Sequence, residues 1–282
     1  MPRSCTIGAV TIGAGHPLAI IAGPCTLESR DLGLDVAARL AEWCADANLP
    51  YVFKASLDKA NRSSADSPRG PGIERGLDWL ADIKERCAVP VTTDIHLPEH
   101  AALVASVVDC LQIPAFLCRQ SDLLTAAAHA ARQHDRAVNV KKGQFLAPTE
   151  MRHPVRKLAE AGCTNVLLTE RGTFFGYHRL VNDFLGLGDL MHMDSPDTVP
   201  VCFDVTHSTQ TPGSAEQTGG RPERAPLLAR AATAAGVNAL FIECHPTPST
   251  AVSDAATQLP LATMKSLLLQ VAAIRDALTW ER

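Results

Sequence analysis

The sequence is poor in aromatic residues and lacks a paired cysteine motif, a long apolar run and an excess of basic charge. Aromatic residues make up 5% of the 282 residues, so alanine, leucine and valine must build most of the core. The 26 Lys and Arg against 30 Asp and Glu give a net charge of −4, which argues against a general nucleic-acid-binding protein. This balance does not exclude a small anionic ligand, which needs only a few local cations.

Nine cysteines are scattered through the chain without a CxxC pair. This pattern is unlike a secreted disulfide framework and favours a reducing compartment. Residues 5–27 contain no Asp, Glu, Lys or Arg, but glycines and prolines interrupt them and the basic start of a signal peptide is missing. We therefore expect a cytoplasmic protein with neither a membrane nor a nucleic-acid partner.

Eight short apolar runs alternate with segments of helical periodicity. The runs are residues 18–22, 51–53, 89–94, 110–114, 137–141, 165–169, 199–205 and 239–243. Such runs suit the buried strands of a parallel sheet. Eight strand–helix units predict a (β/α)8 TIM barrel, which usually has about 250 residues. A doubly wound open sheet is the alternative, but no G-x-G-x-x-G follows the first run.

We expect residues 1–282 to form one barrel domain with residues 1–17 as an N-terminal extension. Residues 6–12, followed by Gly13-Ala14-Gly15, predict a small hairpin that caps the bottom of the barrel. Gly162 and Gly236 stand where helices should end before the next strand.

In such barrels the chemistry lies at the C-terminal ends of the strands, where this chain carries unusual polar residues. They are Cys25, Lys54, Lys59, Asp94, Gln112, Lys141, Arg171, His207, Glu243 and Asp254. Barrel closure would bring the thiol, the imidazole and the last two carboxylates together, a donor set suited to Zn²⁺, Fe²⁺ or Mn²⁺. Each of these four residues alone also has an ordinary structural explanation. His245 is a competing ligand, whereas Cys244 should face the outer helices.

Cations form a second group at the same end of the predicted barrel. The group comprises Lys54, Lys59, Arg62, Lys141 or Lys142, and Arg171. A ligand with phosphate and carboxylate groups needs such cations, and residues 61–64 (NRSS) favour a phosphate-binding loop. Ordinary surface cations are the alternative explanation, more so for Lys142 and Arg69 than for Lys141. A Schiff-base lysine is a rival chemistry for this fold.

Several long segments, in order, resemble the 3-deoxy-D-manno-octulosonate 8-phosphate synthase family over nearly the whole chain. They are residues 21–29 (IAGPCTLES), 53–64 (FKASLDKANRSS), 138–145 (VNVKKGQF), 169–177 (TERGTFFGY), 204–207 (DVTH) and 243–246 (ECHP). The resemblance implies condensation of phosphoenolpyruvate with arabinose 5-phosphate for the lipopolysaccharide inner core. It also implies a homotetrameric barrel without an organic cofactor.

The resemblance also implies roles for individual residues. Lys59, Lys141 and Arg171 would hold phosphoenolpyruvate, with Lys54, Asp94 and Gln112 among the substrate-binding residues. Asn61, Arg62 and Ser63 would bind arabinose 5-phosphate, and Arg119 would reach its phosphate from an adjacent subunit. His207 and Asp254 would serve in catalysis as well as in metal binding.

Two features of the resemblance bear on the metal and on the sugar. The metal-dependent branch of the family has Cys at the position of Cys25, where the other branch has Asn, and residues 253–260 (SDAATQLP) also resemble that branch. One divalent ion held by Cys25, His207, Glu243 and Asp254 is therefore expected. A related seven-carbon synthase carries Lys-Pro-Arg-Thr where this chain has residues 59–62 (KANR), which favours the five-carbon sugar. The seven-carbon activity and a non-catalytic sugar-phosphate-binding barrel are the alternatives.

Overall fold

Eight parallel strands close into a barrel in the computed structural model, which describes residues 3–59, 69–174, 177–213 and 219–278. The strands are β3 (Ala19–Gly23), β4 (Tyr51–Lys54), β5 (Val91–Asp94), β6 (Cys110–Ile113), β7 (Ala137–Lys141), β8 (Val166–Glu170), β11 (Val201–Asp204) and β14 (Ala239–His245). Each strand pairs with the next in this order, and β14 pairs with both β11 and β3. The (β/α)8 barrel predicted from the alternating pattern is confirmed.

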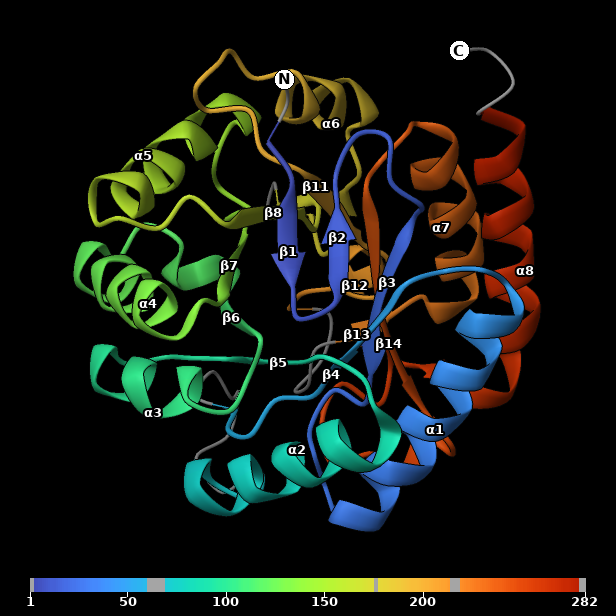
Figure 1. Ribbon diagram of the computed structural model, residues 1–282. Coiled ribbons are helices and arrows are strands. Elements are labelled where there is room, and N and C mark those ends of the chain that lie inside the picture. The colour runs from blue at the N-terminus through green and yellow to red at the C-terminus, as the bar shows by residue number, and fades with distance from the viewer. Residues whose placement is uncertain (1–2, 60–68, 175–176, 214–218, 279–282) are drawn as a thin grey trace.

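Helices form a ring around these strands (Figure 1). They are α1 (Arg30–Asp46), α2 (Ile73–Cys87), α3 (Ala101–Ala105), α4 (Ser121–His134), α5 (Arg152–Glu160), α6 (Phe184–Met191), α7 (Ala225–Ala234) and α8 (Leu261–Leu278). Gly162 and Gly236 follow α5 and α7 with φ of 91° and 93°, the left-handed conformation expected where a helix ends. None of the helices in the described residues is long and apolar enough to span a membrane.

The remaining strands are short and lie outside the eight-stranded barrel. They are β1 (Cys5–Ile7) with β2 (Val10–Ile12), β9 (Thr173–Phe174) with β10 (Leu180–Val181), β12 (Gln210–Thr211) with β13 (Gly219–Gly220), and β15 (Leu259–Pro260), which pairs with the end of β14. The loop after β8 carries the second pair, and the loop after β11 carries the third. Both loops therefore lie at the C-terminal end of the barrel.

Along each barrel strand the side chains point alternately toward the helices and into the barrel, because the side-chain period of a strand is two residues. On β14, Leu240, Ile242 and Cys244 pack in the layer between strands and helices, which confirms the expected orientation of Cys244. Phe241 instead belongs to the cluster inside the barrel. Two residues further along the same face, Glu243 lines the pocket at the C-terminal end. The barrel interior therefore changes from apolar at one end to charged at the other.

The hairpin β1–β2 closes the apolar end. Cys5, Ile7, Val10 and Ile12 form one hydrophobic cluster with the inward-facing side chains at the start of the barrel strands. Asn165, just before β8, fixes the hairpin, because its side chain accepts from Thr6 N and donates to Thr6 O, each at 2.8 Å. Figure 1 shows the hairpin in front of the barrel opening. The predicted cap is thus present, and the C-terminal end of the barrel remains open to a ligand.

Candidate active site and metal centre

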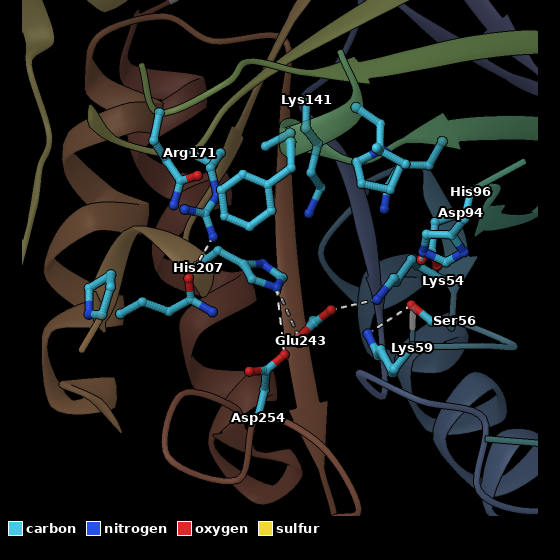
Figure 2. A pocket seen from close by; sticks show the side chains of 18 residues that line it. Lys54, Ser56, Lys59, Asp94, His96, Lys141, Arg171, His207, Glu243 and Asp254 are labelled. Atoms are coloured by element: carbon cyan, nitrogen blue, oxygen red, sulfur yellow. Dashed lines mark hydrogen bonds and ion pairs between the residues drawn. The ribbon is translucent and has the colours of Figure 1, made fainter. Parts of the chain in front are cut away.

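One pocket of about 580 Å³ opens at the C-terminal ends of the barrel strands. Nine of the predicted site residues line it: Lys54, Lys59, Asp94, Gln112, Lys141, Arg171, His207, Glu243 and Asp254. They come from β4, β5, β6, β7, β8, β11 and β14 or from the loops that follow these strands. Residues far apart in the sequence therefore face one space, as Figure 2 shows for the labelled side chains.

Two lysines of the pocket share an aromatic platform. Lys141 Nζ lies 3.6 Å and Lys54 Nζ lies 5.3 Å from the ring centroid of Phe241. The negative face of an aromatic ring attracts such cations, more strongly where water is excluded. Because burial outweighs the attraction of Asp204, the pKa of Lys141 lies below its ordinary value. Phe241 was not predicted as a site residue, although the alternation along β14 places it on the inward face.

Arg171 follows β8, the strand that pairs with β7 and its Lys141. Its Nη2 donates to Gln210 Oε1 at 2.6 Å, and burial lowers the pKa of its guanidinium. Five buried side-chain atoms that belong to pocket residues lack a hydrogen-bond partner among the described residues: Arg171 Nη1, Gln112 Oε1, Gln144 Oε1, Asp94 Oδ1 and Glu243 Oε2. Unpaired buried polar groups cost free energy, so these atoms favour a polar ligand in the pocket.

The four predicted metal ligands converge, although Cys25 and Asp254 stand 229 positions apart. Ligand atoms of Cys25, Glu243 and Asp254 all lie within 4.8 Å of one another. His207 Nε2 lies 3.7 Å from Glu243 Oε2 and 3.9 Å from Asp254 Oδ2. Figure 2 shows the imidazole and both carboxylates turned toward one point.

Glu243 and Cys25 show that this donor set fits a cation. Glu243 is fully buried, and its Oε2 has no hydrogen-bond partner within the described residues. Although burial opposes ionisation, Lys54 and His207 hold the pKa of Glu243 well below its ordinary range. Burial and the two carboxylates raise the pKa of the Cys25 thiol, against a smaller opposing effect of Lys59 and Lys54. A buried carboxylate oxygen, a thiol and an imidazole together suit a borderline divalent ion.

Asp204 joins this site from the end of β11. Its Oδ2 contacts His207 Nδ1 at 2.8 Å and accepts from Lys141 Nζ at 2.6 Å. Burial alone would raise the pKa of Asp204, but His207 and Lys141 lower it well below its ordinary range. A carboxylate on one ring nitrogen orients the other toward a metal. Asp204 was not predicted as a site residue, although it shares the inward face of a predicted strand with Cys202.

His245, the competing ligand, makes other contacts. Its Nδ1 accepts from Thr247 N at 3.0 Å, and its Nε2 lies 3.6 Å from Glu28 Oε1. His245 is absent from the cluster of close ligand atoms within the described residues. His207 is the histidine that faces the carboxylates.

Asp94 and His96 form a further pair on the pocket wall, with 3.0 Å between Oδ2 and Nε2. Burial opposes the charged forms, but the pair lowers the pKa of Asp94 and raises the pKa of His96. Lys59, whose Nζ donates to Ser56 Oγ at 2.9 Å, also favours the charged form of Asp94. His96, Ser56, Gln144 and Gln210 line the pocket without having been predicted, because loops have no period to read.

The remaining predicted cations lie elsewhere. Lys142 is only 1% exposed, so its interpretation as an ordinary surface cation is wrong: its Nζ lies 3.5 Å from Glu170 Oε2 and donates to Gly143 O. Arg69 pairs with Asp58 on the surface, as that interpretation expected. Arg119 is exposed and does not line the pocket within one chain. Asn61, Arg62 and Ser63 lie outside the described residues.

The fold and the pocket define a (β/α)8-barrel enzyme with a cationic pocket beside a cluster of side chains that could hold a metal ion. The chain belongs to the DAHP synthetase I family, whose profile matches residues 4–279. It is 50% identical over 272 residues to a 2-dehydro-3-deoxyphosphooctonate aldolase of Cyanothece sp., covering 96% of this chain and 97% of that protein.

Two further relatives with the same name are equally similar. The protein of Nitratidesulfovibrio vulgaris is 51% identical over 256 residues, which is 90% of this chain and 91% of that protein. The protein of Granulibacter bethesdensis is 51% identical over 267 residues, which is 94% of this chain and 92% of that protein. The family resemblance found in the sequence motifs is thus confirmed.

Proposed function

We propose that this chain condenses phosphoenolpyruvate with D-arabinose 5-phosphate and water, giving 3-deoxy-D-manno-octulosonate 8-phosphate and inorganic phosphate. The observation that carries the proposal is one pocket lined by Lys54, Lys59, Lys141 and Arg171 beside a thiol, an imidazole and two carboxylates. The name shared by relatives about half identical to this chain supports the same product. The sequence motifs assign this reaction to lipopolysaccharide inner-core synthesis.

The cations suit phosphoenolpyruvate, a small molecule with a carboxylate and a phosphate. We assign Lys59, Lys141 and Arg171 to this anion, with Lys54 and Gln112 beside it. Arg171 supplies a planar guanidinium for bidentate contacts, whereas the lysines supply point charges. Fixing the anion in a buried pocket orients its methylene carbon toward the second substrate.

The second substrate is assigned to the side of the pocket next to Lys59. Asn61, Arg62 and Ser63 follow Lys59 in the sequence after one intervening residue, and Asp94 and His96 line the pocket together with Lys59. We propose that Arg119 of a neighbouring subunit reaches the sugar phosphate in a homotetramer. The exposed Phe116, Phe145, Phe174 and Leu185 near this end of the barrel support such an assembly.

The reaction forms one carbon–carbon bond, forms one carbon–oxygen bond with water and breaks the carbon–oxygen bond to phosphate. The methylene of phosphoenolpyruvate attacks the sugar aldehyde while water adds at the enol-ether carbon, and phosphate then leaves from the resulting hemiketal phosphate. Lys141, Lys59 and Arg171 stabilise the charges that the phosphate and carboxylate carry throughout. We assign proton transfer at the water and the aldehyde oxygen to Asp254, and His207 to the metal site through its Nε2.

We further propose that Cys25, His207, Glu243 and Asp254 hold one divalent ion, with Zn²⁺, Fe²⁺ and Mn²⁺ as the candidates. The buried, unpaired Glu243 Oε2 and the convergence of the four side chains support this assignment. Such an ion, when bound, supplies a Lewis acid that polarises an aldehyde or lowers the pKa of a water molecule.

The seven-carbon synthase activity is the second candidate, because the matching profile carries its name. A phosphate-release assay with phosphoenolpyruvate and either arabinose 5-phosphate or erythrose 4-phosphate separates the two. We expect a much higher kcat/KM with arabinose 5-phosphate. Equal or reversed values would overturn the sugar assignment, and no phosphate release with either sugar would favour a non-catalytic barrel. Borohydride trapping with substrate would reveal a Schiff-base lysine instead.

A further inference from the structure

The cation cluster and the metal-ligand cluster are joined by two ion pairs. Lys54 Nζ donates to Glu243 Oε1 at 2.5 Å, and Lys141 Nζ donates to Asp204 Oδ2 at 2.6 Å. That same oxygen of Asp204 contacts His207 Nδ1. Each pair therefore connects a lysine assigned to phosphoenolpyruvate with a metal ligand, directly at Glu243 and through Asp204 at His207.

Both pairs are shielded from solvent. The side chains of Asp204 and Glu243 are 0% exposed, and those of Lys54 and Lys141 are 2% and 6% exposed. Water and salt screen such charges far less than they screen charges at a surface. When a ligand binds to Lys54, Lys141, Asp204 or Glu243, it must therefore alter the electrostatic energy of the other three side chains.

We propose that Asp204 is a positioning residue that makes the binding of phosphoenolpyruvate and of the divalent ion mutually dependent. The proposal rests on the function proposed above. Asp204 holds an ammonium of the anion site with the same oxygen that holds an imidazole of the metal site. It is therefore the one carboxylate in the described residues that contacts both Lys141 and His207.

The sign of the coupling follows from the charges. Without ligands, Lys54 and Lys141 are the counter-ions of Glu243 and Asp204. A divalent ion would neutralise Glu243 and add positive charge near both lysines, which would strengthen their attraction for an anion. A bound phosphoenolpyruvate would in turn neutralise the lysines and leave Glu243 and Asp204 more attractive to a cation. Each ligand should therefore tighten the binding of the other, by the same factor.

Asp204 also orients His207, and the strength of this contact depends on the charge of the Asp204 carboxylate. Its Oδ1 accepts from His207 N at 2.9 Å, and its Oδ2 contacts the ring at Nδ1. These two contacts leave Nε2 facing Glu243 and Asp254. When phosphoenolpyruvate draws Lys141 away, the carboxylate would retain a full charge for the imidazole, which would make Nε2 a better ligand.

The first test measures binding to the intact protein, not turnover. Free Mn²⁺ is followed by electron paramagnetic resonance with and without saturating phosphoenolpyruvate, corrected for Mn²⁺ bound by phosphoenolpyruvate alone. We expect Mn²⁺ to bind roughly 5- to 150-fold more tightly with phosphoenolpyruvate, the range typical of coupled sites. Calorimetric titration of phosphoenolpyruvate with and without Mn²⁺ should give the same factor. If both ligands bind but the factor is one, the coupling is refuted while the proposed function stands. If neither binds, the proposed function itself fails.

The second test compares two buried carboxylates that each contact two basic side chains. Asp204→Asn removes the shared charge, whereas Asp109→Asn changes a residue that accepts from Lys84 and Arg136, distant from the pocket. We expect the coupling factor to fall close to one in Asp204→Asn and to keep its parental value in Asp109→Asn. Equal factors in the two variants would overturn the role of Asp204.

A third variant tests the same contact independently, so that the proposal stays testable if Asp204→Asn does not fold. Lys141→Met removes the ammonium but leaves the contact between Asp204 and His207 in place. The coupling factor should fall several-fold in this variant, measured at phosphoenolpyruvate concentrations raised to reach saturation. A parental factor in Lys141→Met would show that the Asp204 contact does not transmit the effect.

Discussion

Cys25 Sγ lies 3.1 Å from Asp254 Oδ2, although the two residues stand 229 positions apart in the chain. The contact exists because β3 and β14 are neighbours in the closed barrel. Burial and this carboxylate both raise the pKa of the thiol, and a divalent ion beside the sulfur would oppose both effects. The first prediction therefore concerns the metal.

The protein purified without chelator should hold roughly one divalent ion per chain and should lose most of its activity in excess chelator. Activity should return with Mn²⁺, Fe²⁺ or Zn²⁺, because the S/N/O donor set accepts each of them. His207→Ala should lose both metal and turnover. Metal analysis paired with phosphate-release assays checks this expectation.

Cys25→Asn is the sharper variant, since it replaces the thiol by an amide that can hydrogen-bond water. We expect weaker metal retention and a partial activity that survives chelation. Cys44→Ser, in the outer layer on α1, serves as the matched cysteine control and should keep the parental metal content. A parent protein that holds no metal and works fully in chelator would refute the four-ligand site.

The second prediction concerns the anion-binding cations. Lys141→Ala or Arg171→Ala removes a charged hydrogen bond to bound phosphoenolpyruvate, which is worth about 1.5–3 kcal/mol. The value of kcat/KM should fall about ten- to hundred-fold, and thermal unfolding should show that the fold persists. Arg39→Ala, which removes an exposed partner of Asp35 on α1, should leave kcat/KM unchanged. Parental kinetics in both pocket variants would mean that phosphoenolpyruvate binds elsewhere.

The third prediction concerns the pH dependence of the Asp94–His96 pair. Although burial opposes it, Asp94 raises the pKa of His96 above its ordinary value of 6.5. The pair should stabilise the fold fully below that value and lose this contribution as pH rises through the folded pKa of His96. Asp94, whose pKa is lowered, loses its own contribution only in acid, below about pH 4.

Asp94→Asn should therefore lower the pKa of His96, measured by NMR titration of the imidazole protons. The variant should also flatten the change in unfolding free energy above about pH 6.5. Asp82→Asn removes a carboxylate paired with Arg30 at the surface of α2 and should change neither quantity. An unchanged pKa of His96 in Asp94→Asn would contradict the pairing.

Most of the barrel and much of the pocket could be predicted because both depend on periodicity. Strand alternation places Cys244 toward the helices and Glu243 toward the pocket, and barrel closure brings Cys25 to Asp254. Lys142 escaped prediction because its burial depends on Glu170 and on the backbone carbonyls of the loop after β7. Gln210 likewise depends on the loop after β11, where no period indicates which side chain reaches Arg171.

The last prediction concerns the hairpin that closes the apolar end of the barrel. Ile7 is 0% exposed and packs in the cluster that fills the barrel interior. Ile7→Ala leaves a cavity there and should lower the unfolding free energy by about 2–5 kcal/mol, whereas Ile7→Val should cost about 0.5–1.5 kcal/mol. Denaturant unfolding measures both changes. Because the pocket lies at the opposite end, both variants should keep the parental KM for phosphoenolpyruvate under conditions where they are folded. A stable Ile7→Ala would show that the hairpin does not complete the core, and a raised KM with a native fold would show that the two ends of the barrel are not independent.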